Sequence, residues 1–328
     1  MKTAFFSSHK FEHHSIAKAN HHKHELVFIE ETLSKKTIPL AQGCQAICIF
    51  VNDKTDALVL RKLKEIGIKF IALRSAGFNH VALVEAEKLG FKIARVPEYS
   101  PFSVSEHAMA LMLALNRKLV HAHNRINELN FSLDGLVGFD MNGKTVGIVG
   151  TGKIGQQMAK ILHGFGCKIL AYDQYENENI KKDFGVTYVS LNTLFSKADI
   201  ISLHLPLSSE TKYIIYEKSI RLMKKGVMLI NTSRGGLVNT IDVIEGIKSE
   251  RIGYFGMDVY EDEGGLFFED HSQTILQDDV FARLMSFQNV LITSHQAFLT
   301  ETSLKNIATT TIHNIDCFEQ NILSGNEL

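Results

Sequence analysis

The stretch Gly150-Thr-Gly-Lys-Ile-Gly155 constrains the fold of this chain more than any other feature. An apolar run, Val146–Val149, precedes it, and apolar residues at helical spacing follow it, so the sequence predicts a strand, a tight turn and a helix. A GxGxxG stretch in that context is typical of a turn that binds a dinucleotide. Gly150 permits the turn, Gly152 lets the backbone approach a pyrophosphate, and Gly155 lets the helix pack closely on the strand.

The residues around this turn favour NAD over NADP. The predicted helix N-terminus, at Lys153 and Ile154, supplies N–H donors and positive potential to phosphates. Asp173 lies 18 residues after Gly155, at the end of the next predicted strand. Its carboxylate can accept hydrogen bonds from a ribose and would repel a 2′-phosphate. An N-cap role for Asp173 is the structural alternative.

The rest of the chain alternates short apolar runs with helical patterns. Its 328 residues fit about two domains. Strands separated by helices favour βαβ units and parallel sheets, so we expect an α/β protein. The predicted strands are Thr3–Ser7, Leu26–Glu30, Ala46–Val51, Lys69–Leu73, Phe91–Arg95, Thr145–Val149, Lys168–Tyr172, Val186–Val189, Asp199–His204, Val227–Asn231, Gly253–Val259 and Asn289–Thr293.

Two long helices stand out. The first begins at Pro101, behind a possible Ser100 cap, and its apolar periodicity runs as far as Leu119. The second is the last element of the chain, with one apolar face between Leu304 and Phe318. No strand follows it, so the sequence alone leaves open which domain it packs against.

Composition excludes several classes of protein. Hydrophobic residues make up 45% and charged residues 22%, which is ordinary globular usage. A net charge of −1 gives no general attraction to nucleic acid or to an anionic membrane. No apolar stretch reaches the ~20 residues of a membrane span, and no signal peptide is visible. The four cysteines form no CxxC pair, so we expect reduced thiols and a cytoplasmic protein.

Polar residues at predicted strand ends point to chemistry, because ligands of open α/β sheets bind outside those ends. Arg234 suits a carboxylate, since a guanidinium binds one through two parallel hydrogen bonds. His295 is the best acid/base candidate. Glu263 could orient its imidazole, although spacing cannot prove that contact. Hydride transfer to a 2-keto acid needs NAD, a residue that binds the carboxylate and a residue that donates a proton, and these candidates would supply that set.

Each of these residues also has a purely structural interpretation. An arginine such as Arg234 is commonly a surface or ion-pair residue, and His295 could be a core or loop histidine. Glu263 lies in an acidic run, which usually marks a solvated face. Six histidines crowd the first 24 residues, but their scatter suits a polar surface helix better than a metal site, and we predict no metal.

The sequence resembles the D-isomer-specific 2-hydroxyacid dehydrogenases over nearly its whole length. The stretches that carry the resemblance are Cys48–Asp53, Ala72–Asn79, Arg95–Pro101, Asn130–Leu133, Val149–Gly155, His204–Pro206, Asn231–Gly235, Gly256–Glu261, Leu266–Asp270 and His295–Phe298.

The resemblance implies a role for each matching residue. Arg234 would bind the substrate carboxylate and the reacting oxygen, and His295, paired with Glu263, would donate the proton. The substrate would also be lined by Ser75, Ala76, Gly77, Tyr99, Phe50 and Phe298. NAD would be held by Gly150, Gly152, Lys153, Ile154, Gly155, Asp173, His204, Leu205, Pro206, Thr232, Ser233 and Asp258.

The resemblance also implies the architecture: two doubly wound parallel-sheet domains, a Rossmann NAD-binding domain inserted into a flavodoxin-like substrate domain. Residues 1–100 and 297–328 would form the substrate domain, and 101–296 would bind NAD. The implied reaction is the reversible reduction of pyruvate to D-lactate by a homo-oligomer, a dimer or tetramer. A bulkier 2-keto acid or hydroxypyruvate as substrate, and an NAD sensor without catalysis, are the alternatives.

Overall fold

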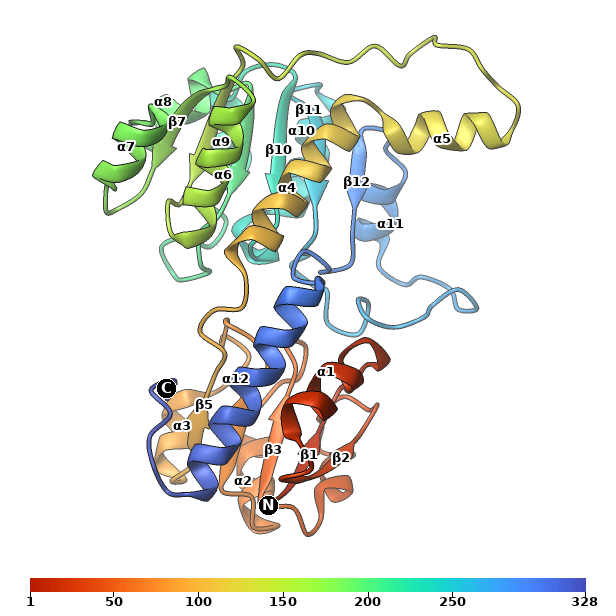
Figure 1. Ribbon diagram of the computed structural model, residues 1–328. Coiled ribbons are helices and arrows are strands. Elements are labelled where there is room, and N and C mark those ends of the chain that lie inside the picture. Colours follow the sequence, from red (N-terminus) through yellow and green to blue (C-terminus); the bar gives the residue numbers. More distant parts are fainter. The chain divides into compact units, whose positions relative to one another are not determined.

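The computed structural model describes all 328 residues, and they form two compact units (Figure 1). The first comprises Met1–Ser100 and Phe298–Leu328, and the second, Pro101–Ala297, is inserted between them in the chain. The sequence places these divisions after residue 100 and before residue 297. Which unit takes the substrate and which takes the cofactor stays a prediction.

The first unit is built on a parallel sheet of order β2-β1-β3-β4-β5. Its strands are β1 (Lys2–Phe5), β2 (Glu25–Phe28), β3 (Ala46–Ile49), β4 (Phe70–Leu73) and β5 (Lys92–Ala94). Every residue of β3 and β4 is buried, as expected for strands covered on both faces. The strand order reverses between β1 and β3, which makes their carboxyl ends the switch point of the sheet.

Helices cover both faces of this sheet. They are α1 (Lys10–Asn20), the 3₁₀ turn η1 (Ile38–Ala41), α2 (Ala57–Glu65), α3 (Leu83–Lys88) and α12 (Glu301–Glu319). The terminal helix α12 lies beside α1 (Figure 1) and buries Ala308, Ile312 and Ile315 against residues of the strands. The structure thereby answers the question that the sequence left open: the last helix packs against the first unit.

The second unit contains a seven-stranded parallel sheet of order β12-β11-β10-β9-β6-β7-β8. Its strands are β6 (Thr145–Val149), β7 (Lys168–Tyr172), β8 (Thr187–Tyr188), β9 (Ile200–Leu203), β10 (Val227–Asn231), β11 (Ile252–Met257) and β12 (Val290–Ile292). All twelve predicted strands are present, with bounds that differ by at most two residues. The predicted fold class of two doubly wound parallel sheets is confirmed.

Two layers of helices enclose the second sheet. They are α4 (Pro101–Asn116), α5 (Leu119–Asn127), α6 (Lys153–Gly164), α7 (Glu178–Phe184), α8 (Leu191–Lys197), α9 (Glu217–Leu222), the 3₁₀ turn η2 (Gly235–Leu237), α10 (Thr240–Lys248) and α11 (Asp279–Met285). Alternate residues of β6 face opposite layers: Ile148 joins the core with α4 and α6, whereas Gly147 lies against Leu194 of α8. None of the helices is both long and apolar enough to cross a membrane.

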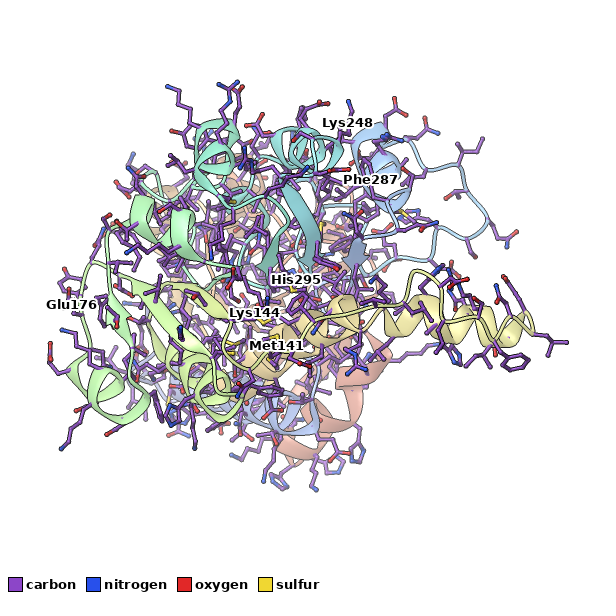
Figure 2. All side chains as sticks on the ribbon, turned by 90° about the horizontal axis from the view of Figure 1, so that it is seen from above. Met141, Lys144, Glu176, Lys248, Phe287 and His295 are labelled. Carbon is purple, nitrogen blue, oxygen red and sulfur yellow. The ribbon has the colours of Figure 1, made fainter.

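The first long helix ends earlier than its periodicity predicts. Lys118 adopts a left-handed conformation (φ +48°), which stops α4 at Asn116 and starts α5 in a new direction. Leu119 is therefore exposed instead of continuing the buried face, and its prediction as part of that face was wrong. Both views show α5 and the loop behind it projecting from the second unit (Figures 1 and 2).

Candidate active site of the second unit

The carboxyl ends of the seven parallel strands bring the predicted cofactor and catalytic residues to one edge of the sheet. These residues are Gly150 after β6, Asp173 after β7, His204 after β9, Thr232–Arg234 after β10, Asp258 after β11 and His295 shortly after β12. The strand order reverses between β6 and β9, and ligands of doubly wound sheets bind at that position.

The glycine turn has the space that a bound pyrophosphate requires. Gly150 has a φ of +99°, and a β-carbon there would lie 2.6 Å from the His204 carbonyl oxygen. At Gly155 a β-carbon would collide with the Gly150 carbonyl, so the close approach of α6 to β6 requires glycine. Nothing lies within 4 Å of the corresponding point at Gly152. This open space lies at the N-terminus of α6, which begins at Lys153 and Ile154.

Asp173 lies beside the glycine turn and is not a helix cap. Its Oδ1 accepts a hydrogen bond from the Tyr175 amide (3.1 Å), and its Oδ2 accepts one from the Thr151 hydroxyl (3.1 Å). The Thr151 amide also donates to Oδ2. The following helix, α7, is capped by Asn177. The structure therefore removes the N-cap alternative and leaves a carboxylate next to the turn, as a ribose-binding role needs.

Two buried polar atoms at this edge have no partner in the chain, the Nδ1 of His204 and the hydroxyl of Thr232. Such atoms are rare in folded proteins, and a ligand or an ordered water commonly satisfies them. The other nitrogen of His204, Nε2, lies 2.9 Å from the Ser202 hydroxyl. Burial lowers the pKa of His204 to about 4, so its ring is neutral near pH 7. Together with the open space at Gly152, these atoms fit a bound dinucleotide.

Arg234 and Glu263 lie on loops that touch each other. Arg234 follows β10, and its Nη1 donates to the Ser233 carbonyl (2.6 Å). The next residue, Gly235, lies so close to the Tyr260 peptide that a β-carbon would collide with it. The guanidinium makes no ion pair within the chain. Arg234 is therefore available to an anion.

Glu263 binds His295 directly. The Glu263 Oε1 lies 2.8 Å from Nδ1 of His295, and its Oε2 accepts a hydrogen bond from the Tyr260 amide (3.1 Å). Both side chains are largely shielded, with exposed fractions of 14% for His295 and 20% for Glu263. Because Nδ1 is engaged, Nε2 is the ring nitrogen left for a substrate. The contact that spacing could not prove is present.

Asp258 holds the segment that carries His295. Its Oδ1 accepts hydrogen bonds from the Thr293 hydroxyl (2.6 Å) and the Gln296 amide (2.8 Å), and its Oδ2 accepts one from the Ala297 amide (2.9 Å). The Asp258 carbonyl also accepts from the His295 amide (2.6 Å). The carboxylate that was expected to face the nicotinamide is thus largely engaged by its own chain, and its contact with the cofactor stays a prediction.

Sequence reasoning missed His107, which completes this network. Its Nε2 lies 3.0 Å from the Thr293 hydroxyl and 3.4 Å from the Asp258 carboxylate. Burial alone would oppose ionisation of Asp258, but hydrogen bonds from His107, Thr293 and the Ala297 amide outweigh it and keep its pKa below the usual value. No spacing in the sequence relates His107 on α4 to residues after β11 and β12.

The acidic run Glu261–Glu263 is not a solvated face. Glu261 accepts hydrogen bonds from the Thr240 amide (2.9 Å) and the Tyr213 hydroxyl (2.7 Å), which fix the loop before Glu263. Only the middle residue, Asp262, is exposed. The solvated-face interpretation was therefore wrong for two of the three carboxylates.

The predicted substrate residues lie in the first unit. Phe298 lies at the centre of an aromatic cluster, with ring centroids 6.1 Å from Phe50 and 6.4 Å from Tyr99. The sequence analysis missed a further member, Phe11 of α1, at 6.2 Å from Phe298. Phe11 in turn stacks on His9 (5.2 Å), one of the histidines that were expected on a polar surface. A lone aromatic at a helix start carries no signal that would have identified it.

The loop that follows β4 in the first unit offers backbone N–H groups as hydrogen-bond donors. Ser75 closes it with a hydrogen bond from its hydroxyl to the Gly77 carbonyl (2.7 Å), and Arg95 donates to the Ala76 carbonyl (2.7 Å). The amides of Ala76 and Gly77 donate to no group of the chain. The neighbouring Arg74 is a structural residue, since it is buried and paired with Glu12.

The six N-terminal histidines divide between the surface and the interior of the first unit: His14, His21 and His22 are exposed, as predicted, whereas His13 and His24 contact other residues. His13 lies 2.8 Å from the Ser8 hydroxyl, and the buried His24 lies 2.8 Å from the Asp316 carboxylate of α12. No three His, Cys, Asp or Glu side chains anywhere in the chain are grouped as metal ligands.

Comparison with known proteins identifies the family. Residues 109–297 match the model of the D-isomer-specific 2-hydroxyacid dehydrogenase NAD-binding domain. The chain is 48% identical to D-lactate dehydrogenase of Escherichia coli over 329 aligned residues, covering 100% of both proteins.

Solved structures agree with this match. The apo structure of the Escherichia coli D-lactate dehydrogenase superposes with a TM-score of 0.91 at 46% identity, covering 100% of both chains. The Aquifex aeolicus D-lactate dehydrogenase, solved with NAD and lactic acid, gives 0.89 at 33% identity, covering 99% of this chain and 98% of the other. This chain belongs to the D-isomer-specific 2-hydroxyacid dehydrogenases and is an NAD-dependent oxidoreductase.

Proposed function

We propose that the protein is an NAD-dependent D-lactate dehydrogenase that reversibly reduces pyruvate to D-lactate. The observation that carries this proposal is the His295–Glu263 pair (2.8 Å), on a loop that touches the loop of the unpaired Arg234. An imidazole held by a carboxylate and a guanidinium without a partner supply the proton and the anchor that a 2-keto acid needs. Full-length similarity to D-lactate dehydrogenases supports pyruvate as the substrate.

The second unit would be the NAD-binding domain (residues 101–296) and the first the substrate domain (residues 1–100 and 297–328). Gly150, Gly152, Lys153, Ile154 and Gly155 would hold the pyrophosphate at the start of α6. Asp173 would bind the adenosine ribose, and Asp258 would face the nicotinamide amide. The walls of the cofactor site would be His204, Leu205, Pro206, Thr232 and Ser233. When bound, NADH supplies the hydride.

The site would recognise the carboxylate end of the substrate by charge and its methyl end by shape. Arg234 would bind the carboxylate and the reacting oxygen, with the Ser75–Gly77 loop and Tyr99 on the carboxylate side. The Ala76 and Gly77 amides have no acceptor in the chain and suit such an anion. Phe50 and Phe298 would leave room for only a methyl group, since both rings are buried in the aromatic cluster.

Proton transfer would belong to His295. In reduction its Nε2 gives a proton to the carbonyl oxygen while the carbonyl carbon receives the hydride. Glu263 holds Nδ1 at 2.8 Å, which fixes the orientation of the ring and leaves Nε2 to face the substrate. The balance is pyruvate plus NADH plus a proton to D-lactate plus NAD⁺, and oxidation of D-lactate uses the same groups in reverse.

The test is NADH oxidation by the purified protein with pyruvate, with a stereospecific assay of the lactate formed. We expect kcat/KM to be highest for pyruvate in a series with hydroxypyruvate, 2-ketoisocaproate and phenylpyruvate. A maximum on a branched or aromatic acid would move the assignment to a related 2-hydroxyacid dehydrogenase. Tight NADH binding without turnover of any keto acid would indicate a sensor.

We also propose that two copies of the chain associate through the projecting arm, defined as α5 and residues 128–140. Its apolar side chains are largely exposed, with 78% for Leu129, 70% for Phe131 and 79% for Leu133. Apolar side chains gathered on a projecting segment mark an interaction surface, and an isologous pair buries the same segment of both copies.

Sedimentation velocity tests this association. We expect a dimer or a larger even assembly for the wild type and dissociation for the double variant Phe131→Asp/Leu133→Asp. Ile275→Asp is the matched control, because Ile275 is equally exposed (84%) but lies outside the arm. A monomeric wild type, or an assembly that survives the double substitution, would contradict the proposal.

We place the protein in the cytoplasm. All four cysteines are free, and burial raises the pKa of the Cys48 thiol to about 12, so its reactive thiolate is suppressed. Free thiols fit a reducing compartment. Cell fractionation followed by the pyruvate-dependent oxidation assay tests the placement, and activity confined to another fraction would contradict it.

A further inference from the structure

The loop Leu266–Asp270 has no role in the mechanism described so far, although only two glycines separate it from Glu263. The Leu266 and Phe267 amides both donate to the Glu263 carbonyl, at 3.1 Å and 3.0 Å. The chain therefore turns tightly on the residue that binds His295. Phe267 anchors the turn in the core, where its ring lies 5.8 Å from that of Phe281.

The next residue, Phe268, lies against His295. Its ring centroid is 5.8 Å from that of His295, with an angle of 38° between the ring planes. Its side chain is half-buried and packs against the main core of the second unit. One aromatic of the Phe267–Phe268 pair thus fixes the loop, and the other reaches the imidazole.

The backbone of Phe268 is strained to make this contact. Its φ is +69°, a left-handed conformation that phenylalanine rarely adopts. Gly265, just before this loop, also has a left-handed φ (+79°), but in glycine that conformation costs little. Strain held at a bulky residue beside reacting groups points to a function for its side chain.

The contact supplies a constraint that the Glu263 hydrogen bond lacks. A single bond at Nδ1 fixes one point of the imidazole but lets the ring rock about the Nδ1–Oε1 direction. Packing of a second ring against His295 limits that motion and so fixes where Nε2 points. His295 itself has a φ of +52°, so its backbone alone does not place the ring in a common conformation.

We infer that Phe268 is a positioning residue: its ring holds the His295 imidazole so that Nε2 meets the carbonyl oxygen of the substrate. This inference rests on the proposed role of His295. The Leu266–Asp270 loop then has a function, because its strained turn at Phe268 brings the phenyl ring against His295.

Three substitutions separate the ring from the backbone. Phe268→Gly removes the ring and relieves the strain, Phe268→Leu removes the ring and keeps the strain, and Phe268→Tyr keeps the ring. We expect kcat to fall about tenfold in the Gly and Leu variants, because a misplaced proton donor slows the chemical step. KM should change by less than about twofold, and Phe268→Tyr should retain wild-type kcat.

Two further measurements distinguish positioning from general damage. The solvent deuterium isotope effect on kcat should increase in the Gly and Leu variants, because proton transfer becomes more limiting. The matched control is Phe287→Leu, since Phe287 packs on the same core but precedes β12, whereas His295 follows it. Urea unfolding of each variant shows that the comparison is made on folded protein.

Wild-type kcat in Phe268→Gly would overturn the inference, because the strained turn would then need no ring. So would a change in KM alone, or an equal loss of kcat in Phe287→Leu. All variants are assayed with the keto acid on which the wild type is most active. A wild type that prefers an acid other than pyruvate therefore counts against the proposed substrate and not against the role of Phe268.

Discussion

Gly235 packs its α-carbon against the peptide of Tyr260, in a space that no β-carbon can enter. This contact joins the loop of Arg234 to the loop of Glu263, two residues far apart in the chain. Arg234, the proposed anchor, and Glu263, the proposed orienting residue, are therefore linked through one close backbone contact.

The first prediction follows from this junction. Gly235→Ala should push the two loops apart, and because a shift of about 1 Å can cost a hundredfold, kcat/KM should fall about that much. Overpacking should also lower the free energy of unfolding by about 1–3 kcal/mol. Steady-state kinetics and urea unfolding measure the two effects.

The control for this substitution is Gly164→Ala. Gly164 ends α6 with nothing within 4 Å of a β-carbon. That variant should keep its activity and gain about 0.5–1 kcal/mol of stability. Unchanged kinetics in Gly235→Ala would show that the junction does not position the site.

His204 should make stability depend on pH in the NAD-free protein. Burial lowers its pKa to about 4 in the folded chain, whereas an unfolded histidine titrates near 6.5. The unfolded state therefore binds more protons between these values, and stability falls as the pH drops from about 6.5 to 4, by up to about 3 kcal/mol.

The test is urea unfolding across this range for the wild type and for His204→Asn, which keeps a polar group for Ser202 but does not titrate. The free energy of unfolding of this variant should change less with pH than that of the wild type. His14→Asn, at an exposed position of α1, is the control and should retain the wild-type slope. Equal slopes in His204→Asn and the wild type would contradict the prediction.

Asp258 should contribute stability that acid removes. Its folded pKa lies below the usual value, so its contribution is complete at neutral pH and is lost as the pH falls through that folded pKa. In Asp258→Asn, an NH₂ group that donates hydrogen bonds replaces an oxygen that accepts them from its neighbours. Because buried, charged hydrogen bonds are broken, the free energy of unfolding at pH 7 should fall by about 2–4 kcal/mol.

Urea unfolding at pH 7 and at low pH measures this contribution. The difference between variant and wild type should shrink at low pH, where the wild-type carboxylate is also protonated. Asp262→Asn, at the exposed residue of the acidic run, should change stability little at either pH. A difference that does not depend on pH would rule out the charge of Asp258 as its cause.

The structure shows which features were open to prediction from the sequence. Strands such as Val227–Asn231 were predictable because buried parallel strands are apolar throughout. The polar residues after them were predictable as a group because parallel strands end at one edge. The end of α4 was not predictable, because the apolar periodicity continues past Lys118 and only the left-handed backbone at that residue interrupts the helix.

Several contacts within the site were not predictable either, because they depend on tertiary structure. His107, Phe11 and the ring contact of Phe268 come from elements whose relation is set by packing, and no local pattern reports it. Two of the three bonds to the Asp258 carboxylate come from backbone amides, which every residue type except proline carries. A strand-end aspartate was therefore visible in the sequence, but its partners were not.

Asp173 should set the choice between NADH and NADPH. Asp173→Asn keeps an acceptor for the Thr151 hydroxyl but removes the charge that would repel a 2′-phosphate. The ratio of kcat/KM for NADPH to that for NADH should rise about 10- to 100-fold. Glu176→Gln is the control, because this exposed carboxylate (labelled in Figure 2) pairs with Lys181 instead. An unchanged ratio would remove Asp173 from the cofactor site.

Phe298 should limit the size of the substrate. Its ring is buried among Phe11, Phe50 and Tyr99, so Phe298→Leu opens space where a substituent longer than methyl would enter. The ratio of kcat/KM for 2-ketoisocaproate to that for pyruvate should rise about 10- to 100-fold, the usual effect of one or two methylenes. Phe318→Leu is the control, because its ring stacks on Phe70 (4.6 Å) in the same unit. It should lower stability without changing the ratio, whereas an equal rise in both variants would mean that the aromatic cluster does not border the substrate.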